Sequence, residues 1–154
     1  LAESAVSALR GGLVPLARVV TPNIPEAEVL TGLSIQTVED AVRAAHAIRA
    51  MGARAVIVKG GHLHRDDIVD VLVDGSRIVQ IVAARVAGVH THGTGCTFAA
   101  AIAARLAVGD DVEAAARAAQ AYVAGAMRAG VPLGRGHRPL DHFWRVRPAI
   151  LSQS

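Results

Sequence analysis

The sequence is poor in the residues that build disulfides, zinc sites and membrane helices. It has one cysteine, so it cannot form an internal disulfide, and no CxxC pair or Cys/His cluster indicates structural zinc. No apolar run approaches the ~18 to 20 residues of a membrane helix. The opening LAESAVSALR has neither a basic start followed by an apolar core nor a small-residue cleavage site. We therefore expect a cytoplasmic protein with a free thiol at Cys96 and no membrane partner.

Positive charge is present but is not gathered anywhere. The net charge is +3, and fifteen arginines and a single lysine, Lys59, are spread along 154 residues. Without a basic patch, interleaved aromatic residues or a reader motif, this charge predicts no nucleic-acid partner. With 52% hydrophobic residues and the length of one domain, the chain has enough apolar material for a substantial core.

The first half of the chain alternates helix and strand patterns. Hydrophobic spacing and turn residues predict, in order, a helix over 1–10, a short strand ending at Pro22, a short helix over 25–32 and a helix over 37–52. In the last of these, Thr37 is a candidate N-cap with Asp40 at the capping-box spacing, and Gly52 is the stop. Its expected apolar face comprises Ala41, Val42, Ala45 and Ile48. Because the helical pattern begins at Leu1 with almost no turn before it, we expect the chain to begin inside a helix.

The second half adds an apolar strand, a hairpin and two long helices. RAVIVKGG, residues 54–61, is a continuous apolar strand of the kind that is buried on both faces of a parallel sheet. Asp74-Gly75 joins two strands within residues 68–86 into an antiparallel hairpin. Two further helices, followed by a loop-like tail, are predicted over 95–108 and 111–129.

The helix that follows Cys96 is apolar on nearly every side. FAAAIAARLA should therefore be buried between two layers rather than lie on a surface. The predicted strands and helices are too few to cover it. We expect residues 1–154 to form part of a larger three-layer α/β domain, with a mostly parallel sheet and an antiparallel hairpin.

Two glycines and the cysteine stand where that helix begins. Gly93 and Gly95 let the backbone approach a ligand, and the unpaired N–H groups of the first turn then point at it. The helix dipole adds partial positive charge there, which favours a phosphoryl group and lowers the pKa of a thiol such as Cys96. The alternative interpretation of the same sequence is a glycine-rich connection with a small buried cysteine and no ligand.

Other chemistries for the cysteine and the histidines can be weighed from spacing. A phosphatase loop would place an arginine a few residues after the cysteine, but Arg105 is too far along the helix. A cysteine hydrolase would need a histidine and an orienting carboxylate or amide brought near by the fold, and this alternative stays open. His62 with His64, and His90 with His92, are candidate metal ligands, although such spacing is common by chance.

Polar residues also follow two of the predicted strands. Asn23 and Glu26 come just past the strand that ends at Pro22, where α/β sheets place ligand sites. A carboxylate there can hold Mg²⁺. Lys59 follows the apolar strand, so its ammonium could reach nucleotide phosphates, or it could equally be a solvated surface lysine.

Together these pieces resemble a known family. TPNIPEAEVLTG, VIVKGGHL, DVLVDG, THGTGCTFAAAIAARLA and GHRPLDHFW, in this order and at these distances, are similar to the carboxyl-terminal half of the hydroxymethylpyrimidine/phosphomethylpyrimidine kinases. These are thiamin-biosynthesis enzymes of the ribokinase-like superfamily. The cysteine of GTGC is the specific part, because most ribokinase-like sugar and nucleoside kinases resemble GAGD there. The chain departs from the family pattern at His90, Arg138 and Asp141, where the family has Asn, Gly and Asn.

The resemblance implies an ATP- and Mg²⁺-dependent kinase with a ribokinase-like three-layer α/β/α fold. Its substrates would be 4-amino-5-hydroxymethyl-2-methylpyrimidine and then the resulting monophosphate. By resemblance, Gly93, Thr94 and Gly95 form the anion hole and Cys96 is the catalytic position. The implied nucleotide-binding residues are Lys59, Asn23 and Thr91, with Glu26 organising Mg²⁺ directly or through water.

The family's amino-terminal half, with most of its pyrimidine site, has no counterpart in these residues. Residues 1–154 would therefore be a partial kinase domain, its nucleotide-binding half, with little or no activity alone. We expect it to self-associate or to associate with the missing half. Two alternatives stay open, namely a pyridoxal-kinase-like enzyme that shares the GTGC turn and a non-catalytic truncated remnant of the kinase.

Overall fold

A computed structural model describes residues 3–62, 67–86, 92–131, 135 and 138–146 of the chain. These residues form two compact units. Unit 1 comprises residues 1–85 with 111–113, and unit 2 comprises residues 86–110 with 114–154. No helix in the described parts is long and apolar enough to cross a membrane.

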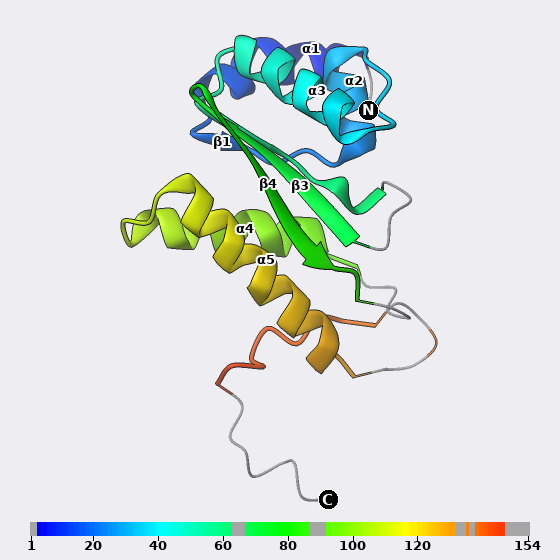
Figure 1. Ribbon diagram of the computed structural model, residues 1–154, viewed down its shortest axis with the longest axis vertical. Coiled ribbons are helices and arrows are strands. Elements are labelled where there is room, and N and C mark those ends of the chain that lie inside the picture. The colour runs from blue at the N-terminus through cyan, green and yellow to red at the C-terminus, as the bar shows by residue number, and fades with distance from the viewer. Residues whose placement is uncertain (1–2, 63–66, 87–91, 132–134, 136–137, 147–154) are drawn as a thin grey trace, which may run out of the picture. The chain divides into compact units, whose positions relative to one another are not determined.

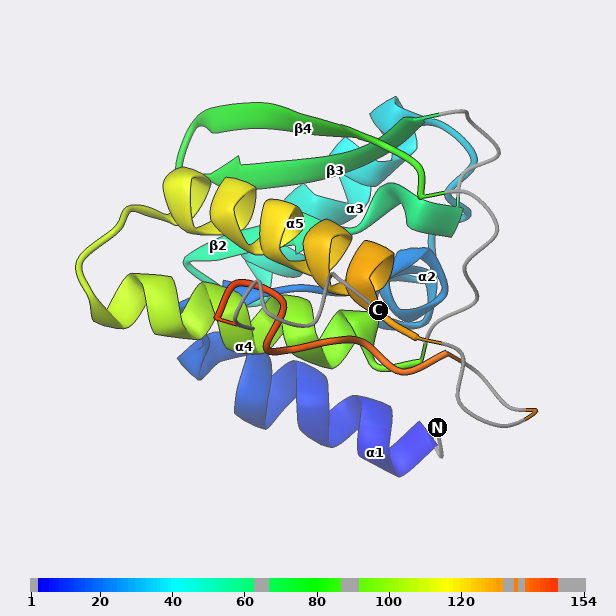
Figure 2. The ribbon, with the colours of Figure 1, turned by 90° about the horizontal axis from the view of Figure 1, so that it is seen from below.

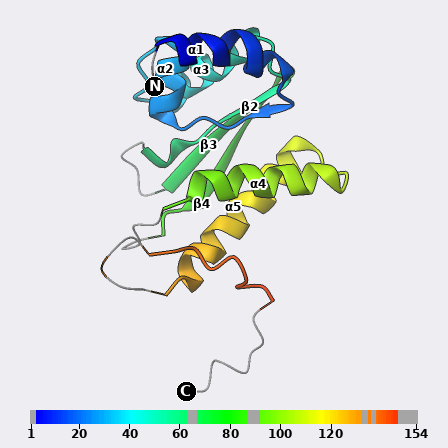
Figure 3. The same ribbon diagram turned by 180° about the vertical axis from the view of Figure 1, so that it is seen from behind.

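Unit 1 alternates helices and strands as its sequence pattern predicts. Its elements are α1 (Glu3–Ala8), the π-helical η1 (Leu9–Leu13), the 3₁₀ turn η2 (Val14–Leu16), β1 (Val19–Val20), α2 (Ile24–Thr31), α3 (Val38–Ala50), β2 (Ala55–Val58), the 3₁₀ turn η3 (Gly60–His62), β3 (Asp67–Asp74) and β4 (Arg77–Ala84). The strands form one sheet in the order β1-β2-β3-β4. Figure 1 shows α2 and α3 on one side of this sheet, and Figure 3 shows the same arrangement from behind.

The sheet is mixed rather than mostly parallel, so that expectation is wrong for the described strands. β1 and β2 are parallel, with Val20 opposite Val56, whereas β2–β3 and β3–β4 are antiparallel. The cause is the short connection between β2 and β3, residues 59–66. A parallel pair needs a crossover of about a dozen residues or more, usually a helix, so β3 has to turn back beside β2.

The core of unit 1 lies between α3 and the sheet. A capping box begins α3: Asp40 N–H donates to Thr37 Oγ1 over 3.1 Å, and Thr37 N–H donates to Asp40 Oδ2 over 3.0 Å. The helix packs against β2 and β3. Of the four expected face residues only Val42 is half-buried, and the fully buried set is Val38, Ala41, Ala44, Ala45 and Ile48. The predicted helix is therefore confirmed, and its buried face includes Val38 and Ala44 in addition to the expected residues.

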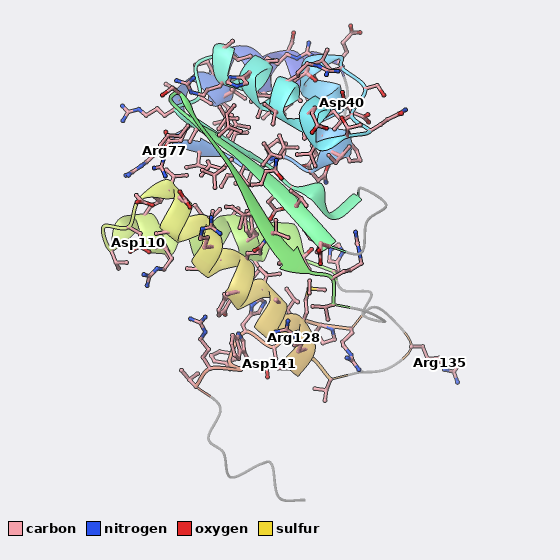
Figure 4. All side chains as sticks on the ribbon, viewed as in Figure 1. Asp40, Arg77, Asp110, Arg128, Arg135 and Asp141 are labelled. Carbon is pink, nitrogen blue, oxygen red and sulfur yellow. The ribbon has the colours of Figure 1, made fainter. Side chains whose placement is uncertain are left out.

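The predicted hairpin is confirmed, with its loop one residue later than the expected Asp74-Gly75. β3 and β4 pair over eight residues each, from Asp67 opposite Ala84 to Asp74 opposite Arg77, and Gly75-Ser76 forms the loop. Near this loop Arg77 makes an ion pair with Glu113 over 2.6 Å, and Figure 4 labels Arg77 at the end of the hairpin. The four residues of β2 are all buried, which confirms the expectation of a strand buried on both faces, although only one of its two neighbouring strands is parallel to it.

Unit 2 consists of two long helices and the segment that follows them. α4 (Thr94–Ala107) is followed by Gly109, which has a positive φ, and α5 (Val112–Ala129) lies beside residues 138–146. Two hydrogen bonds hold that segment on α5. Tyr122 Oη donates to the carbonyl of His142 over 2.8 Å, and Asp141 N–H donates to the carbonyl of Ala126 over 3.0 Å. Figure 2 shows this segment in orange and red along the helices.

Candidate active site

The GTGC turn begins a helix, as predicted. Gly93 is the N-cap of α4 with φ of 88°, a left-handed backbone that residues with a Cβ rarely adopt. The helix begins at Thr94, one residue earlier than its expected start. The backbone conformation at this position therefore requires a glycine. A flexible connection without a fixed conformation would have no such requirement.

The first turn of α4 presents backbone donors. The carbonyl of Gly93 accepts from Thr97 N–H over 3.0 Å and from Thr97 Oγ1 over 2.9 Å, which closes the turn. The N–H groups of Thr94, Gly95 and Cys96 have no acceptor inside the helix because no residue precedes them at the required spacing. Together with the dipole of the helix, three such donors can hold an anion. Cys96 is exposed, so the alternative of a small buried cysteine is wrong.

A pocket of about 570 Å³ in unit 2 opens beside Cys96. One wall is a row of alanines on α4 and α5. The other residues around it are larger and include Arg105, Tyr122, His142 and Arg145. The guanidinium of Arg145 lies 5.0 Å from the ring centre of Trp144 and 5.6 Å from that of Tyr122. This pocket was not predicted from the sequence. Its signal is that Ala100 and Ala104 follow Cys96 at intervals of four residues, which places three small side chains on one face of α4.

Asn23 and Glu26 form a second capping box at the start of α2. Glu26 N–H donates to Asn23 Oδ1, and Asn23 N–H donates to Glu26 Oε2, each over 2.8 Å. This structural role was not predicted from the sequence, although Asn23 followed three residues later by Glu26 is the sequence signature of a capping box. The pair of residues thus has a purpose in folding besides any role in a magnesium site.

Lys59 lies next to this box. Its backbone N–H donates to the carbonyl of Pro22 over 2.9 Å, and Asn23 and Lys59 form an isolated parallel bridge. β1 and β2 are parallel, so their carboxyl ends lie at the same edge of the sheet. Unit 1 therefore brings Asn23, Glu26 and Lys59 together at the edge where α/β sheets place ligands.

The comparisons with known proteins agree with these motifs. The sequence model of the phosphomethylpyrimidine kinase family matches residues 1–141. The chain belongs to this family. The hydroxymethylpyrimidine/phosphomethylpyrimidine kinase of Streptomyces coelicolor is 49% identical over 146 residues, which are 95% of this chain and 54% of that protein. The thiamine biosynthesis bifunctional protein ThiED of Geobacter sulfurreducens is 51% identical over 141 residues, which are 92% of this chain and 29% of that protein.

This member of the phosphomethylpyrimidine kinase family spans about half the length of the curated kinases it matches. Among solved structures, a pyridoxal kinase from Staphylococcus aureus in complex with AMP-PCP and pyridoxal superposes with a TM-score of 0.90 at 37% identity. The match covers 96% of this chain and 56% of that one. The mixed α/β fold is therefore that of part of a ribokinase-like kinase.

The sheet edge offers one carboxylate, that of Glu26, for the Mg²⁺ that the family resemblance implies. Within the described residues no three His, Cys, Asp or Glu side chains gather as a metal site. The capping box engages Glu26 through Oε2, so Oε1 takes no part in that hydrogen bond. Mg²⁺ in kinases usually keeps several waters and takes only one or two carboxylates besides the substrate phosphates. The single carboxylate of Glu26 meets this requirement of one or two protein carboxylates.

The family motif residues fall into two groups. Asn23, Glu26 and Lys59 belong to unit 1, and residues 93–96 belong to unit 2. Thr91, expected to contact nucleotide, lies outside the described residues, as do His64 and His90 of the candidate metal pairs.

Proposed function

We propose that the chain is the nucleotide-binding and catalytic half of a hydroxymethylpyrimidine/phosphomethylpyrimidine kinase. The reaction is ATP-dependent phosphorylation of 4-amino-5-hydroxymethyl-2-methylpyrimidine and then of its monophosphate, for thiamin diphosphate synthesis. One observation carries the proposal: a left-handed Gly93 opens α4 and leaves Cys96 exposed in its first turn. This feature stands in a chain that matches the family over residues 1–141.

The proposed mechanism assigns each group one task. The substrate hydroxyl oxygen attacks the γ-phosphorus of ATP, and the bond from that phosphorus to the leaving ADP oxygen breaks. The N–H groups of Thr94, Gly95 and Cys96 bind the oxygens of the transferred group, and the Lys59 ammonium neutralises phosphate charge. Positioning and charge neutralisation of this kind supply most of the catalysis in phosphoryl transfer. A bound Mg²⁺, held through Glu26 and water, would add positive charge at the phosphates.

Cys96 acts in this proposal as the base for the first transfer. Its thiolate accepts the proton of the hydroxymethyl group as the new P–O bond forms. In the second transfer the acceptor is a phosphate oxygen that carries no such alcohol proton. Cys96 should therefore matter more for the first step than for the second.

A pyridoxal-kinase-like activity is the second candidate. It is favoured by the fold match to the Staphylococcus aureus pyridoxal kinase, which was solved with pyridoxal and AMP-PCP. The Streptomyces coelicolor relative favours the pyrimidine, because it shares 49% identity over 95% of this chain. The two substrates can be offered to one preparation in competition.

A chimera tests the proposed function. Residues 1–154 replace the matching 54% of the Streptomyces coelicolor kinase, and the rest of that protein supplies the remainder. We expect pyrimidine-dependent release of ADP, with pyridoxal a poorer acceptor. A Cys96→Ala variant should slow the first transfer more than the second. A folded chimera that binds nucleotide but transfers nothing would support the non-catalytic remnant instead, and faster turnover of pyridoxal would favour the second candidate.

A further inference from the structure

The turn that follows Lys59 is fixed by a buried carboxylate. Gly60 N–H donates to Asp70 Oδ1 over 2.9 Å. Asp70 lies on β3 and is only 5% exposed, and among the described residues it is the one charged side chain in the buried set. A buried charge is costly unless hydrogen bonds compensate it, so its presence at this position calls for a reason.

The same turn is pressed against the backbone of β3. A Cβ on Gly60 would overlap the carbonyl oxygen of Val69, so only glycine fits there. Val69 directly precedes Asp70. The close approach of the turn to Val69 and its hydrogen bond to Asp70 therefore fix Gly60 at a single place on the strand.

Two other segments hold the residues on either side. Lys59 N–H donates to the carbonyl of Pro22 over 2.9 Å. On the other side, Arg85 Nη1 donates to the carbonyl of Gly61 over 3.0 Å. Residues 59, 60 and 61 are thus tied in turn to the end of β1, to β3 and to the end of β4, and the backbone that carries the Lys59 side chain has little freedom.

We propose that Asp70 is a positioning residue for Lys59. Its carboxylate fixes the Lys59–Gly61 turn, so that the lysine ammonium is directed to the phosphates of the nucleotide without searching other backbone conformations. This assignment rests on the proposed function of Lys59. A displacement of about 1 Å at a catalytic group can cost on the order of a hundredfold in rate, which makes such rigidity useful.

The test uses the chimeric kinase with three variants, two at Asp70 and one at Asp67 on the same strand. Asp70→Ala removes the acceptor for Gly60 N–H, whereas Asp70→Asn keeps an acceptor oxygen and removes the charge. Asp67→Ala is the matched control, because Asp67 is exposed on the same strand. We expect Asp70→Ala to lower kcat about tenfold, with the KM of the pyrimidine unchanged, Asp70→Asn to restore most of that loss and Asp67→Ala to have no effect.

Two further measurements separate the possible failures. Circular dichroism establishes that each variant is folded, and the amide resonance of Gly60 in labelled protein reports its hydrogen bond directly. If a folded Asp70→Ala variant keeps full kcat while Lys59→Ala slows the enzyme, the positioning role is overturned and the proposed function survives. If Lys59→Ala has no effect either, the role of Lys59 fails and that of Asp70 fails with it. An unchanged Gly60 amide in Asp70→Ala would also refute the contact on which the inference depends.

Discussion

Gly125 of α5 lies directly against the indole of Trp144: a Cβ on Gly125 would overlap three atoms of the ring. The absence of a side chain lets the segment 138–146 approach the helix, where Tyr122 Oη also binds it. The ring centres of Tyr122 and Trp144 are 6.4 Å apart at an interplanar angle of 42°, within the range of favourable aromatic pairs. One glycine thus determines how closely the end of the described chain packs on α5.

Gly125→Ala should therefore displace the indole and destabilise unit 2. Overpacking of this kind costs typically about 1 to 3 kcal/mol, which should appear as a lower free energy of unfolding in urea. The emission of Trp144, the chain's single tryptophan, should shift to longer wavelength as the ring becomes more exposed. Gly11→Ala is the matched control, because a Cβ there would meet nothing within 4 Å. An unchanged emission maximum would mean that the indole does not rest on Gly125 in solution.

The capping box of α3 gives a pH dependence. Hydrogen bonds from the backbone of Gln36 and from Thr37 lower the pKa of Asp40 below its ordinary value. Since the pKa is lowered by folding, the carboxylate stabilises the folded chain above the pKa of the unfolded state. That contribution is lost as the pH falls through the folded-state pKa.

We therefore expect Asp40→Asn to lower the melting temperature near pH 7 and to differ progressively less from the parent chain as the pH falls below about 4. Glu39→Gln is a suitable control, since Glu39 is exposed in the same first turn. Melting curves at pH 7, 5 and 3 would decide the question, and a constant difference between parent and Asp40→Asn across these values would argue against the assigned hydrogen bonds.

The two roles of Glu26 can be separated. Glu26→Gln keeps an oxygen that accepts from Asn23 N–H but removes the charge, whereas Glu26→Ala removes both. In the chimeric kinase we expect both variants to need more Mg²⁺ for half-maximal rate. Only Glu26→Ala should also lose stability, by about 0.5 to 1.5 kcal/mol for the one hydrogen bond of the box that it removes. Equal Mg²⁺ requirements for Glu26→Gln and the parent would leave Glu26 with the structural role alone.

Local signals predicted the elements of unit 1 well. Thr37 and Asp40 fix the start of α3 within a few residues of sequence. Asp74-Gly75 predicted the hairpin in the same local way, within one residue of its Gly75-Ser76 loop. The orientation of β2 and β3 was less accessible, because a buried apolar strand looks the same in parallel and antiparallel sheets. The length of the connection, residues 59–66, was the information that decided it.

The residues of the candidate site also differ in how far they could be predicted from local sequence. Gly93, Cys96, Asn23 and Lys59 stood in short motifs and could be selected from the sequence. Asp70 could not, because its function depends on a contact with Gly60 ten residues away across a turn, which no local pattern encodes.

Lys59 itself is open to a direct test. Lys59→Ala in the chimeric kinase should slow both transfers, because in the proposed function the lysine acts on the nucleotide and not on the acceptor. The loss of transition-state stabilisation should be roughly 1 to 3 kcal/mol, the scale of a hydrogen bond to a charged group. Steady-state rates with the pyrimidine and with its monophosphate measure both steps. Unchanged turnover and nucleotide affinity would make Lys59 a solvated surface lysine.

The chain alone should self-associate through α4. β2 needs no further cover, since all four of its residues are buried. In α4, by contrast, only Phe98 and Ile102 are buried among fourteen residues of high apolar content. The exposed alanines of this helix are Ala99, Ala100, Ala103, Ala104 and Ala107. Edge strand β4 adds Ile78 and Val82, which are 50% and 54% exposed. Exposed apolar surface and an open sheet edge both promote association.

Sedimentation of purified residues 1–154 should therefore show dimers or larger species, and a coupled ADP-release assay should show little or no phosphorylation of hydroxymethylpyrimidine. Ala103→Glu places a charge in the middle of the exposed alanine face and should shift the distribution toward monomer. Ala50→Glu, at an exposed position near the end of α3, adds the same charge elsewhere and should not. If both glutamates reduce association equally, net charge and not the α4 face controls it. A monodisperse parent chain with a pyrimidine-dependent rate like that of a complete kinase would show that these residues need no further half.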